Sequence, residues 1–418
     1  MRRALTTFDM ICIGVNAIVG SGIYLFPGKL TGGLGPASTL AFVLTGLFCL
    51  PLALCFASLG GTEDRSGGPY RYATVAFGEK VGFAVGWSAW VTALVSWAAV
   101  ANALPRYLGH FVPELGHGGA AKAVAATVIF GLGAVKYCGV KPGARVTDVM
   151  TVGKLVPLLI FGVVGLFAIR ASRMTPFAPH GLGPLPAAAL MTMFAYQGFE
   201  VVGVPAGEVR RPRTSVPLAV VASVVISAVL YGLVQLVFVG VGGGPGEAPL
   251  AAASRGFLGS WGADLMAAGG VVSIFGFNAG TALCTPRYVS ALAEDRFVPT
   301  ALARPHPRFE TPALAIVVST ALTLALSQIL DFEHLVDLAV LAVLGQYLAT
   351  AAALVRLGSG IRAKGLGLLS VAISIAFGSQ ATVEQFVVIL GLVAVGAVVA
   401  IATRRSSPRG GSEAPPAR

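Results

Sequence analysis

Residues 18–28 have the sequence IVGSGIYLFPG, and they interrupt an apolar segment that runs from about residue 8 to residue 30. Each glycine in the middle of a helix costs about 1 kcal/mol relative to alanine. A second interruption, FAYQGFE at residues 194–200, lies within the apolar segment 186–207 and includes Glu200. Both segments approach the length that spans a bilayer, where backbone freed from a helix must find other hydrogen-bond partners. We therefore predict that both helices are broken.

The composition of the whole chain predicts an integral membrane protein. Of its 418 residues, 56% are hydrophobic and 11% are charged, and the mean hydropathy is +0.82. Soluble domains carry about a quarter charged residues. This chain therefore has too little polar surface for a water-soluble globule, whereas lipid allows apolar side chains to face outward.

Twelve apolar stretches are long enough, or nearly long enough, to cross a bilayer as helices. Their approximate limits are 8–30, 36–59, 79–104, 121–138, 146–169, 186–207, 215–241, 263–286, 312–330, 333–355, 365–379 and 383–402. We predict an all-α integral membrane protein with twelve transmembrane helices. The segment 403–418 is rich in Pro, Gly, Ser and Arg, and we expect it to be a disordered cytoplasmic tail.

The basic residues predict the orientation. Of the 29 Lys and Arg residues, 22 fall on the side of the two termini and of the connections after spans two, four, six, eight and ten, 6 fall on the other side, and Lys154 lies inside a span. Because cytoplasmic loops carry an excess of Lys and Arg, we expect both termini in the cytoplasm and the protein in the cell membrane. The net charge of +11 then reflects topology, and we expect no nucleic acid partner.

The two interruptions also predict an internal repeat. They lie five spans apart, in spans one and six, at corresponding places of two halves of approximately 8–169 and 186–355. Matching interrupted helices are typical of inverted-repeat transporters, whose substrate site lies at the membrane midplane. The alternative is that these glycines only allow close helix packing.

Residue patterns for catalysis or metal binding are not found in the sequence. The five cysteines lie within or at the edges of apolar spans without C-x-x-C spacing, and the five histidines are scattered. We interpret the cysteines as packing residues and expect no metal and no cofactor. The connections are short and lack clustered acidic or His residues, so an integral-membrane enzyme is a remote alternative.

Four motifs, in order, give the chain a resemblance to a known family over nearly its whole length. They are IVGSGIYLFPG at 18–28, GGPYRYATVAFG at 67–78, FAYQGFEVVGVPAGEVRRPRTSVP at 194–217 and PRYVSALAEDRFVP at 286–299. They resemble the amino acid–polyamine–organocation superfamily of permeases. One departure is Arg211, where the family usually has Asn before Pro212; this puts the local contacts of a cytoplasmic loop in doubt.

The resemblance implies a five-plus-five inverted repeat with two further helices (365–402), and transport of amino acids or related amines. It implies that the amides near Ser21, Gly22 and Ile23 hold the substrate carboxylate. It also implies that the carbonyls of Ile18, Phe194 and Gln197, with Ala195 in the same set, hold the ammonium. Such roles are physically reasonable, because helix ends leave free N–H and C=O groups that carry partial charge.

Further site residues rest on the same resemblance. Phe194 matches an aromatic residue that covers the bound substrate, and otherwise it is an ordinary core Phe. Ser96, Asn278 and Thr281 are candidates for contact with the substrate side chain, although packing or helix bonding is the more common role of such residues. The binding region has no obvious carboxylate besides Glu200, which favours neutral over cationic amino acids.

Two charges inside the predicted spans need a partner or a role. Lys154 matches the span-five lysine of sodium-independent family members, where the ammonium takes the place of a sodium ion between spans one, five and eight. We hypothesise that Lys154 is the coupling or gating cation; the alternative is a lysine that extends to the cytoplasmic interface. Glu200 is either a proton-sensitive gate or a hydrogen-bond partner of the unwound backbone, and Glu208 is expected in the cytoplasmic gate or loop network.

We therefore predict a secondary active amino acid transporter that works by alternating access and is sodium-independent, with proton coupling as one option. Its expected partners are a small-molecule amino acid or amine and the lipid bilayer. Exchange of one amino acid for another or for a polyamine is the main alternative. A channel is disfavoured, because the sequence shows two offset helix breaks and no ring-forming polar filter.

Overall fold

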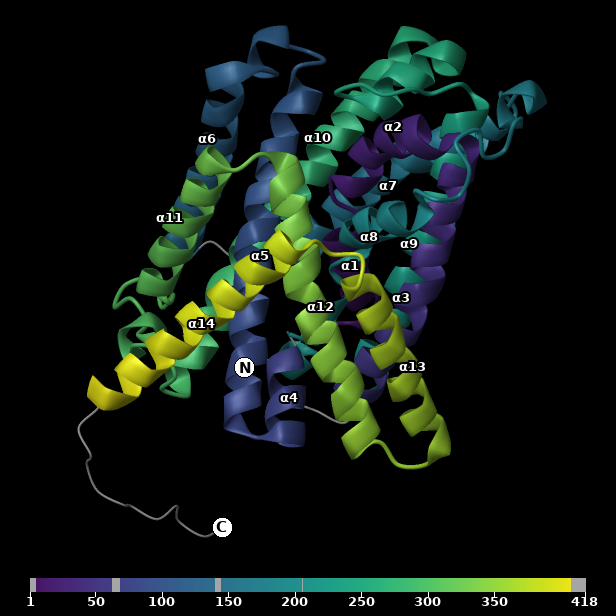
Figure 1. The fold of residues 1–418 in the computed structure, drawn as a ribbon. Coiled ribbons are helices and arrows are strands. Elements are labelled where there is room, and N and C mark those ends of the chain that lie inside the picture. Colours follow the sequence, from purple (N-terminus) through teal and green to yellow (C-terminus); the bar gives the residue numbers. More distant parts are fainter. Residues whose placement is uncertain (1–4, 62–67, 140–143, 205, 407–418) are drawn as a thin grey trace.

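The computed structural model describes residues 5–61, 68–139, 144–204 and 206–406, and Figure 1 shows their helical arrangement. The α-helices in these residues are α1 Thr7–Ile18, α2 Gly22–Leu34, α3 Ser38–Gly60, α4 Pro69–Phe77, α5 Glu79–Leu108, α6 Gly118–Tyr137, α7 Ala144–Leu166, α8 Leu185–Tyr196, α9 Pro212–Gly240, α10 Pro249–Glu294, α11 Ala313–Ile329, α12 Phe332–Leu357, α13 Ile361–Gly378 and α14 Val383–Ser406.

The helices are those of a multi-pass membrane protein. Within the described residues, ten helical segments are long and apolar enough to cross a bilayer, with Gly22–Gly60 taken as one segment, and Thr7–Ile18 and Ala313–Ile329 are shorter apolar helices. Large apolar side chains lie on the outside of the bundle, where Phe130, Val229 and Val398 are about two-thirds exposed (67%, 68% and 65%). In water these groups would be costly, and in lipid they face a matching solvent. The expected all-helical membrane class is confirmed.

The first predicted break is present. α1 opens with a capping box, in which Thr6 and Asp9 bond each other's backbone N–H, and it ends at Ile18. Residues 19–21 are not helical, and α2 starts at Gly22. A Cβ atom built on Gly22 would lie 2.6 Å from the Cβ of Ala195. Glycine at this position therefore allows α2 to touch α8.

The second predicted break is also present. α8 ends at Tyr196, Gln197 is extended, and the 3₁₀ segment η4 Phe199–Gly203 follows. Gly198 has φ +127°, and a Cβ there would lie 2.4 Å from the carbonyl carbon and oxygen of Ala17. Only glycine adopts that conformation without strain. The two breaks, far apart in sequence, therefore lie against each other at the centre of the bundle.

The surrounding helices enclose this centre. α1 packs against α7, α9 and α10, α5 packs against α10 and α12, and α3 packs against α9. α4 lies between the second and third predicted spans, and its Tyr70 hydroxyl donates to the carboxylate of Asp295, at the end of α10. The start of α4 is therefore tied to the end of α10.

Two predicted boundaries were wrong. The connection expected at 242–262 is helical from Pro249, where α10 begins, and a kink at Gly259 (φ +70°) precedes the predicted span. α14 continues to Ser406, past the predicted end at 402. The remainder of the predicted tail, 407–418, lies outside the described residues.

Candidate substrate site

A cavity of about 510 Å³ lies beside the two breaks. Its wall includes Ser21 and Gly22 from the first break and Gln197 from the second. It also reaches Lys136 at the end of α6 and Arg287 on α10, which both lie at the predicted cytoplasmic ends of their helices. The cavity therefore extends from the centre of the bundle toward one end.

The start of α2 offers backbone donors to this cavity. Ser21 is its N-cap residue and Gly22 is its first residue. The N–H groups of Gly22 and Ile23 therefore lie in the first turn, where the helix has no carbonyl to accept them. Ser21 and Gly22 line the cavity, whereas Ile23 is fully buried and is not part of the wall. The Ile23 side chain turns into the packed core, because successive helical residues point about 100° apart.

A tyrosine that the sequence analysis missed joins the ends of α1 and α8. The Tyr231 hydroxyl, on α9, lies 3.1 Å from the carbonyl oxygen of Ile18 and 3.0 Å from that of Ala195. Both residues line the cavity. The Ile18 carbonyl is therefore already a hydrogen-bond acceptor, although a carbonyl has a second lone pair for a ligand. The motifs gave no signal for Tyr231, because it lies outside all four.

Two of the three side-chain candidates lie in the wall. Ser96 on α5 and Thr281 on α10 line the cavity, and the Thr281 hydroxyl donates to its own helix at the Phe277 carbonyl, 3.0 Å away. Asn278 has the alternative role, a hydrogen bond within its own helix. It is fully buried outside the wall, and its amide nitrogen donates to the carbonyl of Ile274. Phe277 and Thr281, one turn apart on α10, both line the cavity. Asn278 is the next residue after Phe277, so its side chain points away from that face of the helix.

Several polar atoms around the breaks are buried without a hydrogen-bond partner. They are Asn16 Oδ1, Ser21 Oγ, and both Gln197 Oε1 and Nε2. All three residues line the cavity and are less than a tenth exposed. Buried polar groups are normally bonded, and each unmet group costs about 1–3 kcal/mol. A polar ligand in the cavity could remove this cost.

Lys154 lies next to the first break and not in the cavity wall. It is fully buried on α7, and its Nζ donates to the carbonyls of Val19 (2.6 Å) and Asn16 (3.1 Å). The hydroxyl of Ser273, on α10, donates to the same Val19 carbonyl at 3.1 Å. The ammonium thus lies between α1, α7 and α10, which contain the predicted spans one, five and eight.

Glu200 supports the second break from within. Its Oε2 accepts hydrogen bonds from the Gly198 backbone N–H (2.9 Å) and from the Tyr347 hydroxyl on α12 (2.8 Å). It is buried and lines the cavity. The geometry matches the second of its two predicted roles, a partner of the unwound backbone. The side chain of Glu208 lies outside the described part of the structure.

The comparison with known proteins agrees with this geometry. A family model described as "Amino acid permease" matches residues 5–407. The chain belongs to the amino acid permease family. Its proteins are transporters and not enzymes, and the family lies in the superfamily that the motifs predict.

Three relatives illustrate the range of the family. The methylthioribose transporter of Bacillus subtilis is 28% identical over 75% of this chain and 72% of its own length. The branched-chain amino acid permease BcaP of the same species is 26% identical over 85% and 81%. The cationic amino acid transporter 4 of Mus musculus is 29% identical over 81% of this chain, which spans 57% of that transporter.

On the other side of the breaks from Lys136 and Arg287, the permease is closed by three aromatic rings. The ring centroids of Phe26 and Phe194 are 6.0 Å apart, and each lies 6.2 Å from that of Phe332. Their side chains are buried. We call these three residues the aromatic lid. Phe194 also lines the cavity, in the place expected of an aromatic cover.

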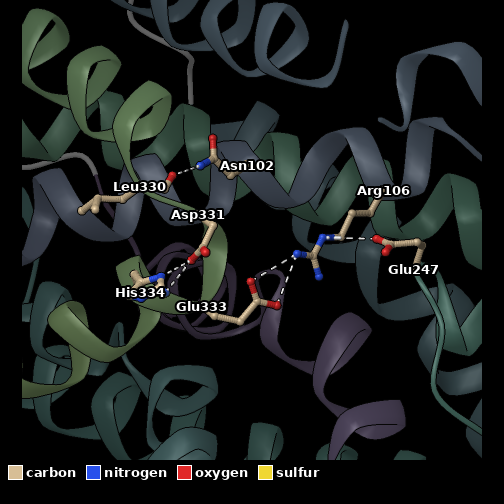
Figure 2. Close-up of polar contacts among 7 residues, drawn as sticks. All are labelled: Asn102, Arg106, Glu247, Leu330, Asp331, Glu333 and His334. Atoms are coloured by element: carbon tan, nitrogen blue, oxygen red, sulfur yellow. Dashed lines mark hydrogen bonds and ion pairs between the residues drawn. The ribbon is translucent and has the colours of Figure 1, made fainter. Parts of the chain in front are cut away.

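A charged cluster, drawn in Figure 2, contacts the lid through Phe332. The Arg106 guanidinium, at the end of α5, is 5.2 Å from the centre of the Phe332 ring. It pairs with Glu333 at the start of α12 (3.3 Å) and with Glu247 in the segment before α10 (3.4 Å). We call Arg106, Glu247 and Glu333 the outer latch. It joins three separate elements above the closed end of the cavity.

Proposed function

We propose that this permease is a secondary active transporter that carries amino acids across the cytoplasmic membrane by alternating access without sodium. The observation that carries the proposal is the meeting of two broken helices at a central cavity. The finer architecture belongs to the same proposal: twelve crossings, with spans one to five and six to ten as inverted repeats, two further helices, and both termini cytoplasmic.

The broken helices suit a zwitterion. The amides at the start of α2 provide donors for a carboxylate, strengthened by the positive end of the helix. The carbonyls at the ends of α1 and α8 provide acceptors for an ammonium. A zwitterion can use both sets at once, so the site neutralises both charges without binding a net ion. The family's amino acid permeases support this substrate class.

The side chain that the site prefers is uncharged. The two hydrogen bonds that Glu200 accepts within the protein hold its Oε2 toward Gly198 and Tyr347, which leaves Oε1 alone for a cationic side chain. Lys136 and Arg287, in the wall toward the predicted cytoplasmic end, would repel one. We propose neutral amino acids as substrates, with the unpartnered amide of Gln197 favouring those that can form hydrogen bonds.

Lys154 supports sodium independence. Its ammonium already provides a positive charge against the Val19 and Asn16 carbonyls, the place between three helices where an ion would otherwise bind. We propose that Lys154 couples the break in α1 to α7 and α10. Lys154 and Glu200 are the two candidate carriers of a coupled proton.

The described conformation corresponds to the inward-facing state in this proposal. The cavity reaches the predicted cytoplasmic ends of α6 and α10, while the aromatic lid covers the opposite side of the breaks. A substrate would leave toward the cytoplasm from this state. Outward opening would need the lid to separate.

Uptake into proteoliposomes tests the function. Empty vesicles with an imposed proton gradient and vesicles loaded with unlabelled amino acid are compared, with and without sodium. Uptake driven by the gradient into empty vesicles would identify symport, and uptake that requires internal amino acid would identify the alternative, an exchanger. Uptake of no amino acid under either condition would contradict the proposal.

A further inference from the structure

The outer latch connects α5 and α12 to the segment before α10. α5 and α12 pack closely together, so Arg106 and Glu333 belong to one packed unit. The segment that contains Glu247 rests on α2: a Cβ at Gly28 would lie 2.9 Å from the Gly244 carbonyl oxygen and 3.0 Å from Pro249. The Arg106–Glu247 pair therefore joins the α5–α12 unit to the segment on α2, close to the hydrogen bond from the Tyr107 hydroxyl on α5 to the Tyr24 carbonyl on α2.

The aromatic lid is divided in the same way. Phe26 is on α2, with the Glu247 segment, whereas Phe332 is on α12, beside Glu333. Separation of α2 from α12 would break the Phe26–Phe332 contact and the Arg106–Glu247 pair together. The Arg106–Glu333 pair would survive that motion, because both residues stay on α5 and α12.

Arg106 is also fixed in position by its own unit. One turn earlier on α5, the Asn102 amide donates to the carbonyl of Ser327 (3.1 Å) in the last turn of α11 and to that of Leu330 (3.0 Å) in the connection to α12. Figure 2 shows the bond to Leu330. Asp331 caps α12 by accepting from the His334 backbone N–H at 2.9 Å. The Asn102 bonds fix the connection before α12 against α5, and the Asp331 cap orders the first turn of α12, so the guanidinium is held above the Phe332 ring.

We propose that Arg106 is a positioning residue that locks the outer side of the permease through its pair with Glu247, and that this pair must break each time the outer side opens. The proposal rests on the alternating access proposed above. The guanidinium does not touch the substrate. It biases the equilibrium between inward-facing and outward-facing states, because its pair with Glu247 exists only when the lid is closed.

The size of this bias is modest and depends on salt. The side chains of Arg106 and Glu247 are 26% and 60% exposed, and pairs in such positions change an equilibrium by about fivefold at most. Contact with the Phe332 ring adds a cation–π attraction. Screening weakens exposed pairs as ionic strength rises, so high salt is expected to favour the outward-facing state.

Labelling from outside intact cells tests the latch. Val100 lines the cavity on α5 and is 1% exposed, and a Val100→Cys variant, with the five native cysteines replaced by alanine, reports access through the lid. The probe is a membrane-impermeant maleimide. We expect Arg106→Gln and Glu247→Gln each to increase the labelling rate about two- to fivefold, and the double variant to match the single ones. Glu333→Gln, which keeps the crossing pair, is the matched control and is expected to change the rate less.

Salt provides a second measurement. In the Val100→Cys protein, labelling is expected to accelerate from low to high salt, and this response is expected to vanish in Arg106→Gln. Unchanged labelling in Arg106→Gln, an equal effect of Glu333→Gln, or a salt response that survives without Arg106 would overturn the latch. If the labelling rate changes with the latch variants and with salt as expected, but the protein takes up no amino acid, the result would contradict the proposed function and not the latch.

Discussion

The ammonium of Lys154 lies 2.6 Å from the carbonyl oxygen of Val19, the residue that ends α1 at the first helix break. A fully buried positive charge thus satisfies backbone that the break leaves without an intrahelical partner. Removing one partner of a buried charged contact typically costs more than the contact contributes. The Lys154–Val19 contact therefore links a side chain outside the cavity wall to the shape of the cavity.

Replacement of Lys154 with methionine tests its coupling role. We expect Lys154→Met to lose the response of uptake to pH and to have at least tenfold lower uptake, because the Val19 and Asn16 carbonyls lose their cationic donor. The measurement is proteoliposome uptake at several pH values. Lys122→Met is the control, because the Lys122 Nζ donates to the Gln328 carbonyl in an exposed position. Wild-type uptake with an intact pH response in Lys154→Met would exclude the role.

Gly198 tests the contact between the breaks. A Cβ atom at Gly198 would overlap the Ala17 backbone, and the φ of +127° is strained for any other residue. We expect Gly198→Ala to lower the thermal midpoint and to abolish uptake. Gly391→Ala, in α14 with no atom within 4 Å of the built Cβ, is expected to leave both unchanged or to stabilise slightly. Similar behaviour of the two variants would show that the close contact is not required.

Tyr231 tests the junction of the two helix ends. We expect Tyr231→Phe to destabilise the protein by about 1 kcal/mol, the usual contribution of one hydrogen bond, because the Ile18 and Ala195 carbonyls lose a shared donor. The same loss is expected to raise KM more than it lowers kcat, since it disturbs the substrate's acceptors. A thermal unfolding series and uptake kinetics measure the two effects. Unchanged KM would remove Tyr231 from the site.

Gln197 tests the preference for polar side chains. A site with buried amide atoms rejects ligands that leave them unpaired. We expect the wild type to favour threonine over its isostere valine by tenfold or more, and Gln197→Leu to reduce or reverse this ratio. Competition uptake measures both. Gln346→Leu is the control, because the Gln346 amide nitrogen already donates to Thr92 at 2.9 Å, and it is expected to affect both amino acids equally. A threonine-to-valine ratio that is the same in wild type and Gln197→Leu would exclude this role.

The sequence predicted the backbone of the site better than its side chains. Gly22 and Gly198 are visible as breaks because glycine in an apolar span is costly, and the structure places both where another residue would clash. Lys154 and Glu200 are visible because charges in apolar spans need partners. Such signals are local, so one sequence suffices to find them.

Other contacts depend on how distant helices meet. Tyr231, Ser273 and Tyr347 are ordinary residues within their spans, and they matter because α9, α10 and α12 bring their hydroxyls to the breaks. Asn278 lies outside the cavity wall, because a one-residue difference rotates a helical side chain away from the cavity. Arg106 and Glu247 lie at the predicted extracellular ends, where charge alone does not identify a partner.

The most direct test of the proposed substrate site is competition by analogues that lack one charge of the zwitterion. Labelled threonine uptake is measured against unlabelled threonine, threonine methyl ester, which has no carboxylate, and N-acetylthreonine, which has no ammonium. We predict that threonine competes and that each analogue is at least a hundredfold weaker, because one set of helix ends is left without its charged partner. If either analogue competes as well as threonine, the broken helices do not bind both ends of the substrate.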